Sequence, residues 1–137
     1  MAAAGMLFAP VLVLLLFSGL GSPMPGGLSH MDIHSAEAQE AARFAIESYN
    51  RGSNAIHLSK IAHVISVKSQ VVQGMMYQVK MQLGKTTCRK SAERNVDLER
   101  CSFQPGLQAS KMQVCTFEIW DRPWVPERQV SNMQCVL

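Results

Sequence analysis

The chain has 137 residues, of which 47% are hydrophobic, and its 13 Lys and Arg against 10 Asp and Glu give a net charge of +3. A chain of this length forms one ordinary domain with a modest core. The basic residues are scattered along the sequence, so the composition disfavours a nucleic-acid-binding protein.

Residues 1–21 are predicted to be a secretory signal peptide. An apolar run extends from Met6 to Leu20, and the small residues from Gly19 to Ser22 are of the kind that a signal peptidase reads. The run of about 15 residues is short of the ~20 that span a bilayer, which disfavours a membrane anchor. We therefore expect cleavage after Gly21 and a secreted, extracellular protein, residues 22–137, that forms a single domain and has no membrane partner.

Residues 22–34 are expected to form a flexible arm. The stretch from Ser22 to His30 is rich in Pro and Gly and lacks hydrophobic periodicity, so it is poorly suited to packing. Taken alone, such an arm is most simply interpreted as a linker.

The segment from Ser35 to Gly52 is predicted to be an α-helix. Ser35 is suited to cap its N-terminus, Glu37 favours the first turn, and Gly52 is suited to a left-handed stop. Small and aromatic residues form one stripe at helical spacing: Ala38, Ala41, Ala42, Ala45 and Tyr49. Because alanine lets a helix lie very close to its neighbour, a sheet wrapped around the helix is its natural partner.

Four later segments have the pattern of β-strands, with β-branched residues and alternating apolar and polar side chains. They are residues 57–69, 75–83, 111–120 and 129–136, separated by a turn at 70–74, a loop at 84–110 and a second turn at 121–127. One early helix followed by an antiparallel meander is typical of the α+β class.

The cysteines predict two disulfides, because an even number in a secreted domain normally pairs. They are Cys88, Cys101, Cys115 and Cys135. Three connectivities are open, and we favour Cys88–Cys101 with Cys115–Cys135, since this pairing closes two short loops. Zinc is disfavoured because no Cys-x-x-Cys pair is present and the four histidines lie far from the cysteines in sequence. We expect no metal, no cofactor and no enzymatic activity, because no catalytic arrangement stands out.

Two of the predicted turns carry large apolar residues where Asn, Asp or Gly is usual. Val71 and Val72 lie in the first turn, and Trp124 lies in the second. Each has a simpler interpretation alone, since a valine near a turn normally tucks into the core and a Trp after Pro often packs on the sheet. Alternate turns of a meander meet at one end of a sheet, however, so both tips and the arm can form one exposed apolar binding surface.

These residues carry a resemblance to the cystatins. The stretch "QVVQG" at 70–74 matches their Gln-x-Val-x-Gly signature, Pro123 and Trp124 match their second hairpin, and the pair Gly26 and Gly27 stands where their N-terminal glycine does. The stretches "FAIESYN" at 44–50 and "GKTTCRK" at 84–90 and the four cysteines extend the likeness over the rest of the chain. The chain resembles a secreted type 2 cystatin.

The resemblance implies an antiparallel sheet of about five strands wrapped around one helix, and a tight-binding, reversible inhibitor of papain-like cysteine proteases such as cathepsins L, B, S and H. In that family an arm and two hairpins form a wedge that occludes the active-site cleft. Three groups of residues are implied to make it: Met24 and Pro25, with Gly26 or Gly27 as hinge, in the unprimed subsites; Gln70, Val71, Val72, Gln73 and Gly74 beside the catalytic cysteine; and Pro123 and Trp124 on the primed side.

Some type 2 cystatins also inhibit legumain, an asparaginyl endopeptidase, through an Asn in the loop after the helix, typically within Ser-Asn-Asp. Here Ser53 and Asn54 match that motif, and Ala55 replaces the acid. The resemblance therefore implies a candidate second site at Ser53 and Asn54. The alternative is that Asn54 only forms the turn, a role that suits asparagine.

A cystatin-fold module without inhibitory activity, such as a carrier or a signalling ligand, is the alternative function. The intact wedge motifs favour the inhibitor, because a repurposed module would have no need of them. We expect a monomer for the most part. Exchange of segments between two copies through the apolar hairpin at 70–74, giving a domain-swapped dimer, is a hypothesis.

Overall fold

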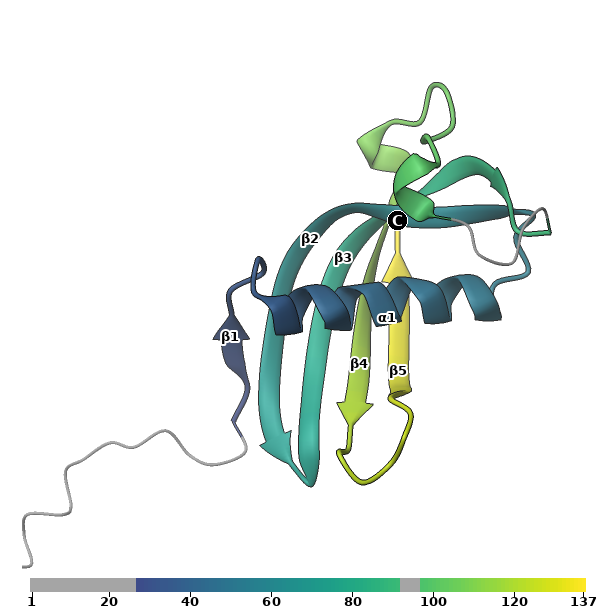
Figure 1. Cartoon of the computed structure of the whole chain (residues 1–137). Helices are drawn as coiled ribbons and strands as arrows, with labels where there is room; N and C mark the ends of the chain where they lie inside the picture. Colours follow the sequence, from purple (N-terminus) through teal and green to yellow (C-terminus); the bar gives the residue numbers. More distant parts are fainter. Residues whose placement is uncertain (1–26, 92–96) are drawn as a thin grey trace, which may run out of the picture.

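The computed structural model describes residues 27–91 and 97–137. Within these residues the chain forms one helix and a five-stranded antiparallel sheet in the order β1-β2-β3-β4-β5 (Figure 1), which confirms the predicted α+β fold. The elements are β1 (Ser29–Met31), α1 (Ala36–Gly52), β2 (His57–Val72), β3 (Gly74–Arg89), β4 (Gln113–Asp121) and β5 (Gln129–Val136), with short 3-10 turns η2 (Leu98–Arg100) and η3 (Ala109–Lys111) between β3 and β4. The predicted signal peptide, 1–21, lies outside the described residues.

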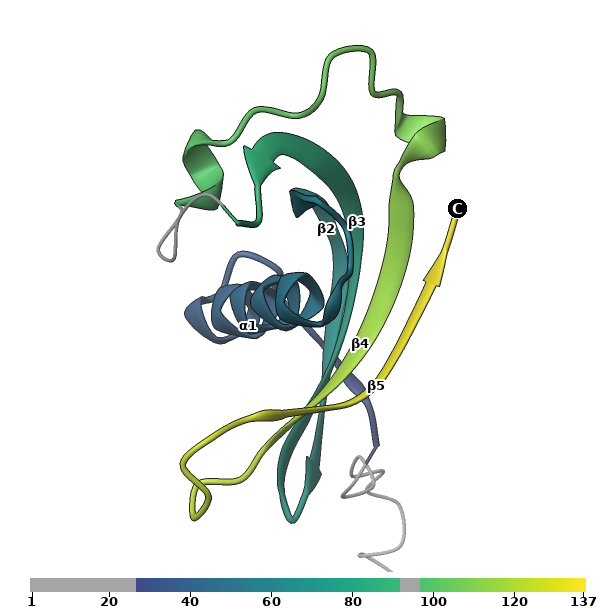
Figure 2. The same ribbon diagram turned by 90° about the vertical axis from the view of Figure 1, so that its right-hand side faces the viewer.

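Helix α1 lies across the concave face of the curved sheet (Figures 1 and 2). Its N-terminus is capped as expected, since the Ser35 hydroxyl accepts a hydrogen bond from the Ala38 amide at 3.2 Å. The alanine stripe is buried against the sheet: Ala38, Ala41, Ala42 and Ala45 meet Val67, Val79, Met81, Phe117 and Ile119. The left-handed stop that we expected at Gly52 is wrong, because Gly52 is the last helical residue and the cap, Ser53, is extended.

Strands β2 and β3 are longer than the sequence pattern indicated. Their pairing continues to Val72 and Gly74 at one end and to His57 and Arg89 at the other, so the turn is shorter than 70–74 and the loop begins after Arg89 instead of at Gly84. Three register shifts in this pair interrupt the regular alternation that predicts strands. They also bend the ribbon around the helix.

Strand β1 falls within the segment that we expected to be a flexible arm. Ser29–Met31 pairs with Val67–Ser69 of β2, and Met31 packs against the core, so that expectation is wrong for these residues. A strand of three residues is too short to show a period in the sequence. Its partner lies nearly 40 positions later in the chain, which is why no local signal predicted it.

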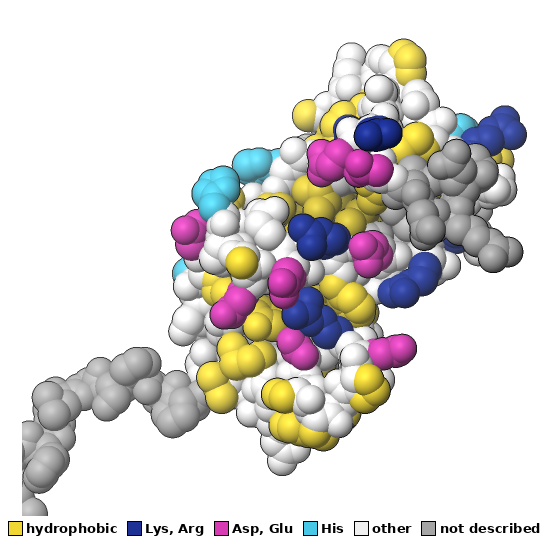
Figure 3. All heavy atoms as spheres, in the orientation of Figure 1, with side chains coloured by type: hydrophobic (Ala, Val, Ile, Leu, Met, Phe, Trp, Pro, Cys, Tyr) yellow, Lys and Arg dark blue, Asp and Glu magenta, His cyan; other side chains and the backbone are white. Residues whose placement is uncertain are grey.

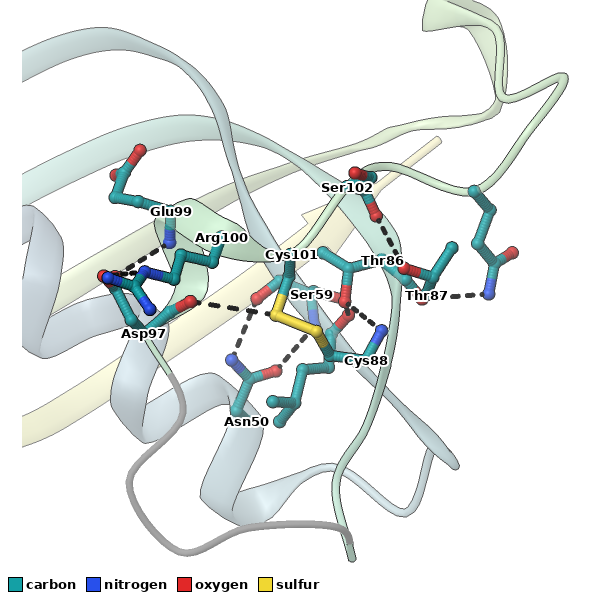
Figure 4. Close-up of a disulfide and its surroundings, with 12 residues drawn as sticks. Asn50, Ser59, Thr86, Thr87, Cys88, Asp97, Glu99, Arg100, Cys101 and Ser102 are labelled. Carbon is teal, nitrogen blue, oxygen red and sulfur yellow. Dashed lines mark hydrogen bonds and ion pairs between the residues drawn. A yellow bond between two sulfur atoms is a disulfide. The ribbon is translucent and has the colours of Figure 1, made fainter.

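The predicted disulfide pairing is present. Cys88–Cys101 joins the end of β3 to the segment after η2, and Cys115–Cys135 joins opposite positions of β4 and β5. Around the first disulfide, buried polar groups are paired (Figure 4): the Asn50 side chain donates to the Ser59 carbonyl and accepts from the Ser59 amide, each at 2.9 Å. This polar cluster fastens the end of α1 to the start of β2.

Candidate functional site: two hairpins at one end of the sheet

The tip of the β2–β3 hairpin, the β4–β5 loop and the start of β1 lie at the same end of the molecule, the lower end in Figure 1. The register explains this, because Ser29 of β1 is opposite Ser69, three residues before Val72, and Asp121 at the end of β4 is opposite Met75. The structure therefore brings together the two apolar turns. Met24, Pro25 and Gly26 lie outside the described residues, whereas Gly27 leads directly into β1.

Large apolar side chains at this end are exposed to solvent. Figure 3 shows hydrophobic side chains gathered at the lower end of the molecule. The exposed fractions are 63% for Val71, 38% for Val72 and 62% for Trp124. The interpretation that these residues tuck into the core or pack on the sheet is wrong. Leu28 is also exposed, at 49%, and was not predicted as part of this surface. Its apolar side chain next to Gly27 could have indicated it.

Gly74 allows the two hairpins to touch. Its φ is +93°, a region that L-residues with a side chain rarely adopt. A Cβ at this position would lie 2.5 Å from the Asp121 carbonyl oxygen and 3.1 Å from the Arg122 Cα, both of them backbone atoms. A glycine here is therefore required by the contact between hairpins within this chain, before any contact with a partner.

A hydrogen bond and a stacked cation join the hairpins further. The Trp120 indole N–H donates to the Gln73 carbonyl at 2.8 Å, which ties the tip of the first hairpin to the end of β4. The Arg122 guanidinium lies over the Trp120 ring, 4.1 Å from its centroid, and donates to the Gln129 side chain at 2.9 Å. Gln73 thus contributes its backbone carbonyl to the contact between the two hairpins. None of these contacts was foreseen from the sequence, since each joins residues distant along the chain or lacks a motif.

The β4–β5 loop is anchored to the helix as well as to the sheet. Arg128 pairs with Asp121 at 3.2 Å and with Glu40 of α1 at 3.3 Å. Beside this group the Tyr77 hydroxyl donates to Glu37 at 3.4 Å. Burial, followed by the neighbouring Glu37 and Asp121 carboxylates, raises the pKa of Tyr77 above its ordinary value. Pro123 and Trp124 form the exposed turn at the tip of this anchored loop.

Comparison with known proteins places the chain in a family. The cystatin domain matches residues 26–124, which include the β2–β3 hairpin and the β4–β5 loop as far as Trp124. The chain is 39% identical over 127 residues to Cystatin-1 of Crotalus adamanteus, covering 90% of this chain and 91% of that protein. It is 36% identical over 130 residues to Cystatin-C of Paralichthys olivaceus, covering 95% of this chain and 98% of that protein. The chain belongs to the cystatin family.

A solved structure agrees with that assignment. The crystal structure of dimeric human cystatin F superimposes with a TM-score of 0.68 at 28% identity, covering 85% of this chain and 92% of that one. Cystatins are protease inhibitors and not enzymes. This chain is therefore a protease inhibitor of the cystatin type, and cysteine proteases are the class of partner that the family binds.

The candidate legumain site of this cystatin lies at the other end of β2. Asn54 is exposed in the connection between α1 and β2, and the Ser53 hydroxyl accepts a hydrogen bond from the Ala55 amide at 3.0 Å. The 16 residues of β2 separate this loop from Val72, roughly 50 Å along the strand at about 3.3 Å per residue. The structure therefore does not bring Ser53 and Asn54 together with the two hairpins.

The described ranges, 27–91 and 97–137, contain no group of three or more His, Cys, Asp or Glu side chains placed to hold a metal ion. Nor do they contain a helix long and apolar enough to cross a membrane.

Proposed function

We propose that this cystatin is a secreted, tight-binding, reversible inhibitor of papain-like cysteine proteases of the cathepsin L, B, S and H class. The observation that carries the proposal is the exposure of Val71, Val72 and Trp124 on two hairpins that brace each other. A soluble protein that presents large apolar side chains together on a narrow end has a surface suited to an apolar cleft.

The energetics support a preformed wedge. Each Å² of apolar surface removed from water contributes about 25 cal/mol before the costs of association. Those costs are low when the binding segments are already ordered. Here the ladder of β2 and β3 reaches Gly74, and the Trp120 to Gln73 hydrogen bond limits movement between the two hairpins. The affinity is therefore expected to come mainly from the valine and tryptophan side chains.

The proposed mechanism is occlusion, with no covalent step. Gln70 to Gly74 would enter beside the catalytic cysteine, and Pro123 and Trp124 would cover the primed side of the cleft. The arm residues Met24 and Pro25 would occupy the unprimed subsites, next to the exposed Leu28. Since the wedge fills the cleft, the substrate is excluded without reaction of the inhibitor.

Titration of the refolded, oxidised residues 22–137 against papain and cathepsin L tests this proposal, with hydrolysis of a fluorogenic peptide as readout. The parent should inhibit both enzymes stoichiometrically and reversibly. The double variant Val72→Asp, Trp124→Ala should lose roughly a thousandfold in affinity, about 4 kcal/mol, because it removes two central anchors. Ile56→Asp is the matched control, since Ile56 is 67% exposed at the other end of β2. A folded parent that leaves both enzymes active would support a non-inhibitory module instead.

A second candidate function is inhibition of legumain through Asn54. Its support is the exposure of Asn54 in an ordered loop, next to the Ser53 hydroxyl that accepts from the Ala55 amide. Asn54→Gln should abolish inhibition of legumain and leave inhibition of papain unchanged, because β2 separates the two sites. Equal inhibition of legumain by parent and variant would mean that Asn54 only forms the turn.

The assembly state is proposed to be mainly monomeric. Human cystatin F in the similar structure is dimeric, and exchange of segments through the β2–β3 hairpin is the route to a dimer that we consider for this chain. Size-exclusion chromatography after heating close to the melting temperature tests it. A protein that stays strictly monomeric under those conditions would argue against exchange.

A further inference from the structure

Lys90, one residue past the end of β3, contacts the chain on both sides of Asn54. Its ammonium donates to the Ser53 carbonyl at 2.5 Å and to the Arg51 carbonyl at 3.3 Å. Its backbone amide donates to the Ile56 carbonyl at 2.8 Å. A single residue therefore fastens the chain before Asn54 to the chain after it.

The charge of Lys90 suits its position. Arg51 lies in the last turn of α1, where unpaired carbonyls form the negative end of the helix dipole. An ammonium group near these carbonyls makes charge-assisted hydrogen bonds, which are stronger than neutral ones. The end of the helix and the Asn54 loop are thus held by the same cation.

Lys90 itself projects from a rigid part of the molecule. Two residues earlier, Cys88 is bonded to Cys101, and the Cys88 amide donates to the Thr86 hydroxyl at 3.2 Å. That hydroxyl donates to the Leu58 carbonyl at 2.7 Å, which links the end of β3 to β2 (Figure 4). The disulfide and these hydrogen bonds fix the point from which Lys90 reaches the loop.

We propose that Lys90 is a positioning residue that makes the Asn54 loop an inhibitor instead of a substrate of asparaginyl endopeptidases. This inference rests on the proposed second site. An exposed Asn followed by a peptide bond is what such an enzyme hydrolyses: water adds across the Asn54–Ala55 bond and leaves a carboxylate on Asn54 and an amine on Ala55. The two new ends separate only if Ser53 and Ile56 move apart, and Lys90 holds both carbonyls.

The Ser53 hydroxyl adds to this restraint from inside the loop. It accepts from the Ala55 amide, the nitrogen of the bond that the enzyme would cleave. Between them, Lys90 and Ser53 hold the backbone on either side of Asn54, while Asn54 itself stays exposed. The loop can therefore enter a protease site in one shape with little loss of conformational freedom on binding.

The test compares parent, Lys90→Met and Lys85→Met during incubation with legumain. Methionine keeps an apolar side chain at position 90 and the hydrogen bond from the backbone amide to the Ile56 carbonyl. It removes the two hydrogen bonds of the ammonium group. Lys85, exposed on β3 five residues before Lys90, is the matched control for loss of one charge. Intact-mass spectrometry follows cleavage after Asn54, fluorogenic substrate follows inhibition of legumain, and titration with papain checks the fold at the far end.

We expect Lys90→Met to be cleaved after Asn54 at least tenfold faster than parent and Lys85→Met, with inhibition of legumain that fades over time and unchanged inhibition of papain. Equal cleavage rates in Lys90→Met and parent would overturn the role of Lys90. A parent that does not inhibit legumain would refute the second site, and the same cleavage rates would still decide the role of Lys90.

Lys90→Arg separates positioning from a general loss of structure. Its guanidinium restores a cation that reaches the same carbonyls, so this variant should resist cleavage as the parent does. If Lys90→Arg and Lys90→Met are both cleaved rapidly and at equal rates, the cation does not hold the loop and the proposal fails. This conclusion does not depend on whether the methionine variant also inhibits papain less well.

Discussion

The two hairpins of the candidate site are built in different ways. In the β2–β3 hairpin, paired strands continue until Val72 faces Gly74, with only Gln73 between them. In the β4–β5 loop, the pairing of β4 with β5 stops at Trp120 and Gln129, and side chains such as Arg128 hold the intervening residues. One hairpin takes its shape from the backbone and the other from its side chains.

This difference has a consequence for substitutions. A main-chain ladder is insensitive to most side-chain changes, except at a glycine whose conformation or proximity forbids a Cβ. A loop held by ion pairs and a stacked cation depends on each of those side chains. We therefore expect the valine hairpin to fail at a single position and the Trp124 loop to weaken gradually as its contacts are removed.

The largest effect is expected for Gly74→Ala. The new Cβ would meet the Asp121 carbonyl at 2.5 Å with φ at +93°, so the free energy of unfolding should fall by about 2 to 3 kcal/mol and papain inhibition should weaken at least a hundredfold. Gly106→Ala is the control, because Gly106 also has a positive φ of +79° but lies in open space. Urea unfolding and papain titration measure both. Similar losses in the two variants would show that contact between the hairpins is unimportant.

An intermediate effect is expected for Trp120→Phe. It keeps an aromatic ring and removes the donor to the Gln73 carbonyl, at a cost of about 1 kcal/mol, or roughly fivefold in papain affinity. Tyr49→Phe removes a comparable hydrogen bond, to Gln113, far from the hairpins. It should lower the melting temperature without changing inhibition. If the two variants inhibit equally well, the Trp120 contact does not shape the site.

A smaller effect is expected for Arg128→Met, which breaks the ion pairs to Asp121 and Glu40. Because these groups are partly exposed, the free energy of papain binding should weaken by only about 0.5 to 1 kcal/mol, and the effect should be smaller at high salt. Arg100→Met removes an exposed pair with Asp97 and should change nothing. Papain dissociation rates at two salt concentrations measure the difference, and a salt-independent loss would contradict an electrostatic anchor.

The smallest effect concerns pH. The pKa of Tyr77 is raised in the folded protein by burial, so the unfolded chain loses this proton first as pH rises above about 10. The stabilisation is fully present below the unfolded pKa and declines as pH rises through the folded pKa. Urea unfolding between pH 8 and 11 should therefore show a steeper decline for parent than for Tyr77→Phe, and parallel curves would contradict the shift.

Local patterns predicted much of this molecule. The alanine stripe of α1 and the alternation after Met75 each depend on neighbouring residues, and the two disulfides followed from the even number of cysteines and the short loops that they close. Strand β1 and the last residues of β3, from Gly84 to Arg89, were missed because their partners lie far along the chain, so no local periodicity predicts the pairing. The same reason hid the contacts of Trp120 and Lys90, which depend on the approach of distant backbone atoms.

Because of where the disulfides lie, a thiol reductant would affect the two hairpins differently. Cys115–Cys135 closes the segment that contains Trp124, and Cys88–Cys101 lies next to Lys90, whereas α1, β2 and the tip of the β2–β3 hairpin contain no cysteine. In a reducing compartment, the Trp124 loop and the Lys90 attachment would therefore lose their covalent restraints. The tip of the β2–β3 hairpin, which carries Val71 and Val72, has no disulfide for a reductant to break. Redox conditions would then act on one hairpin of the inhibitor and spare the other.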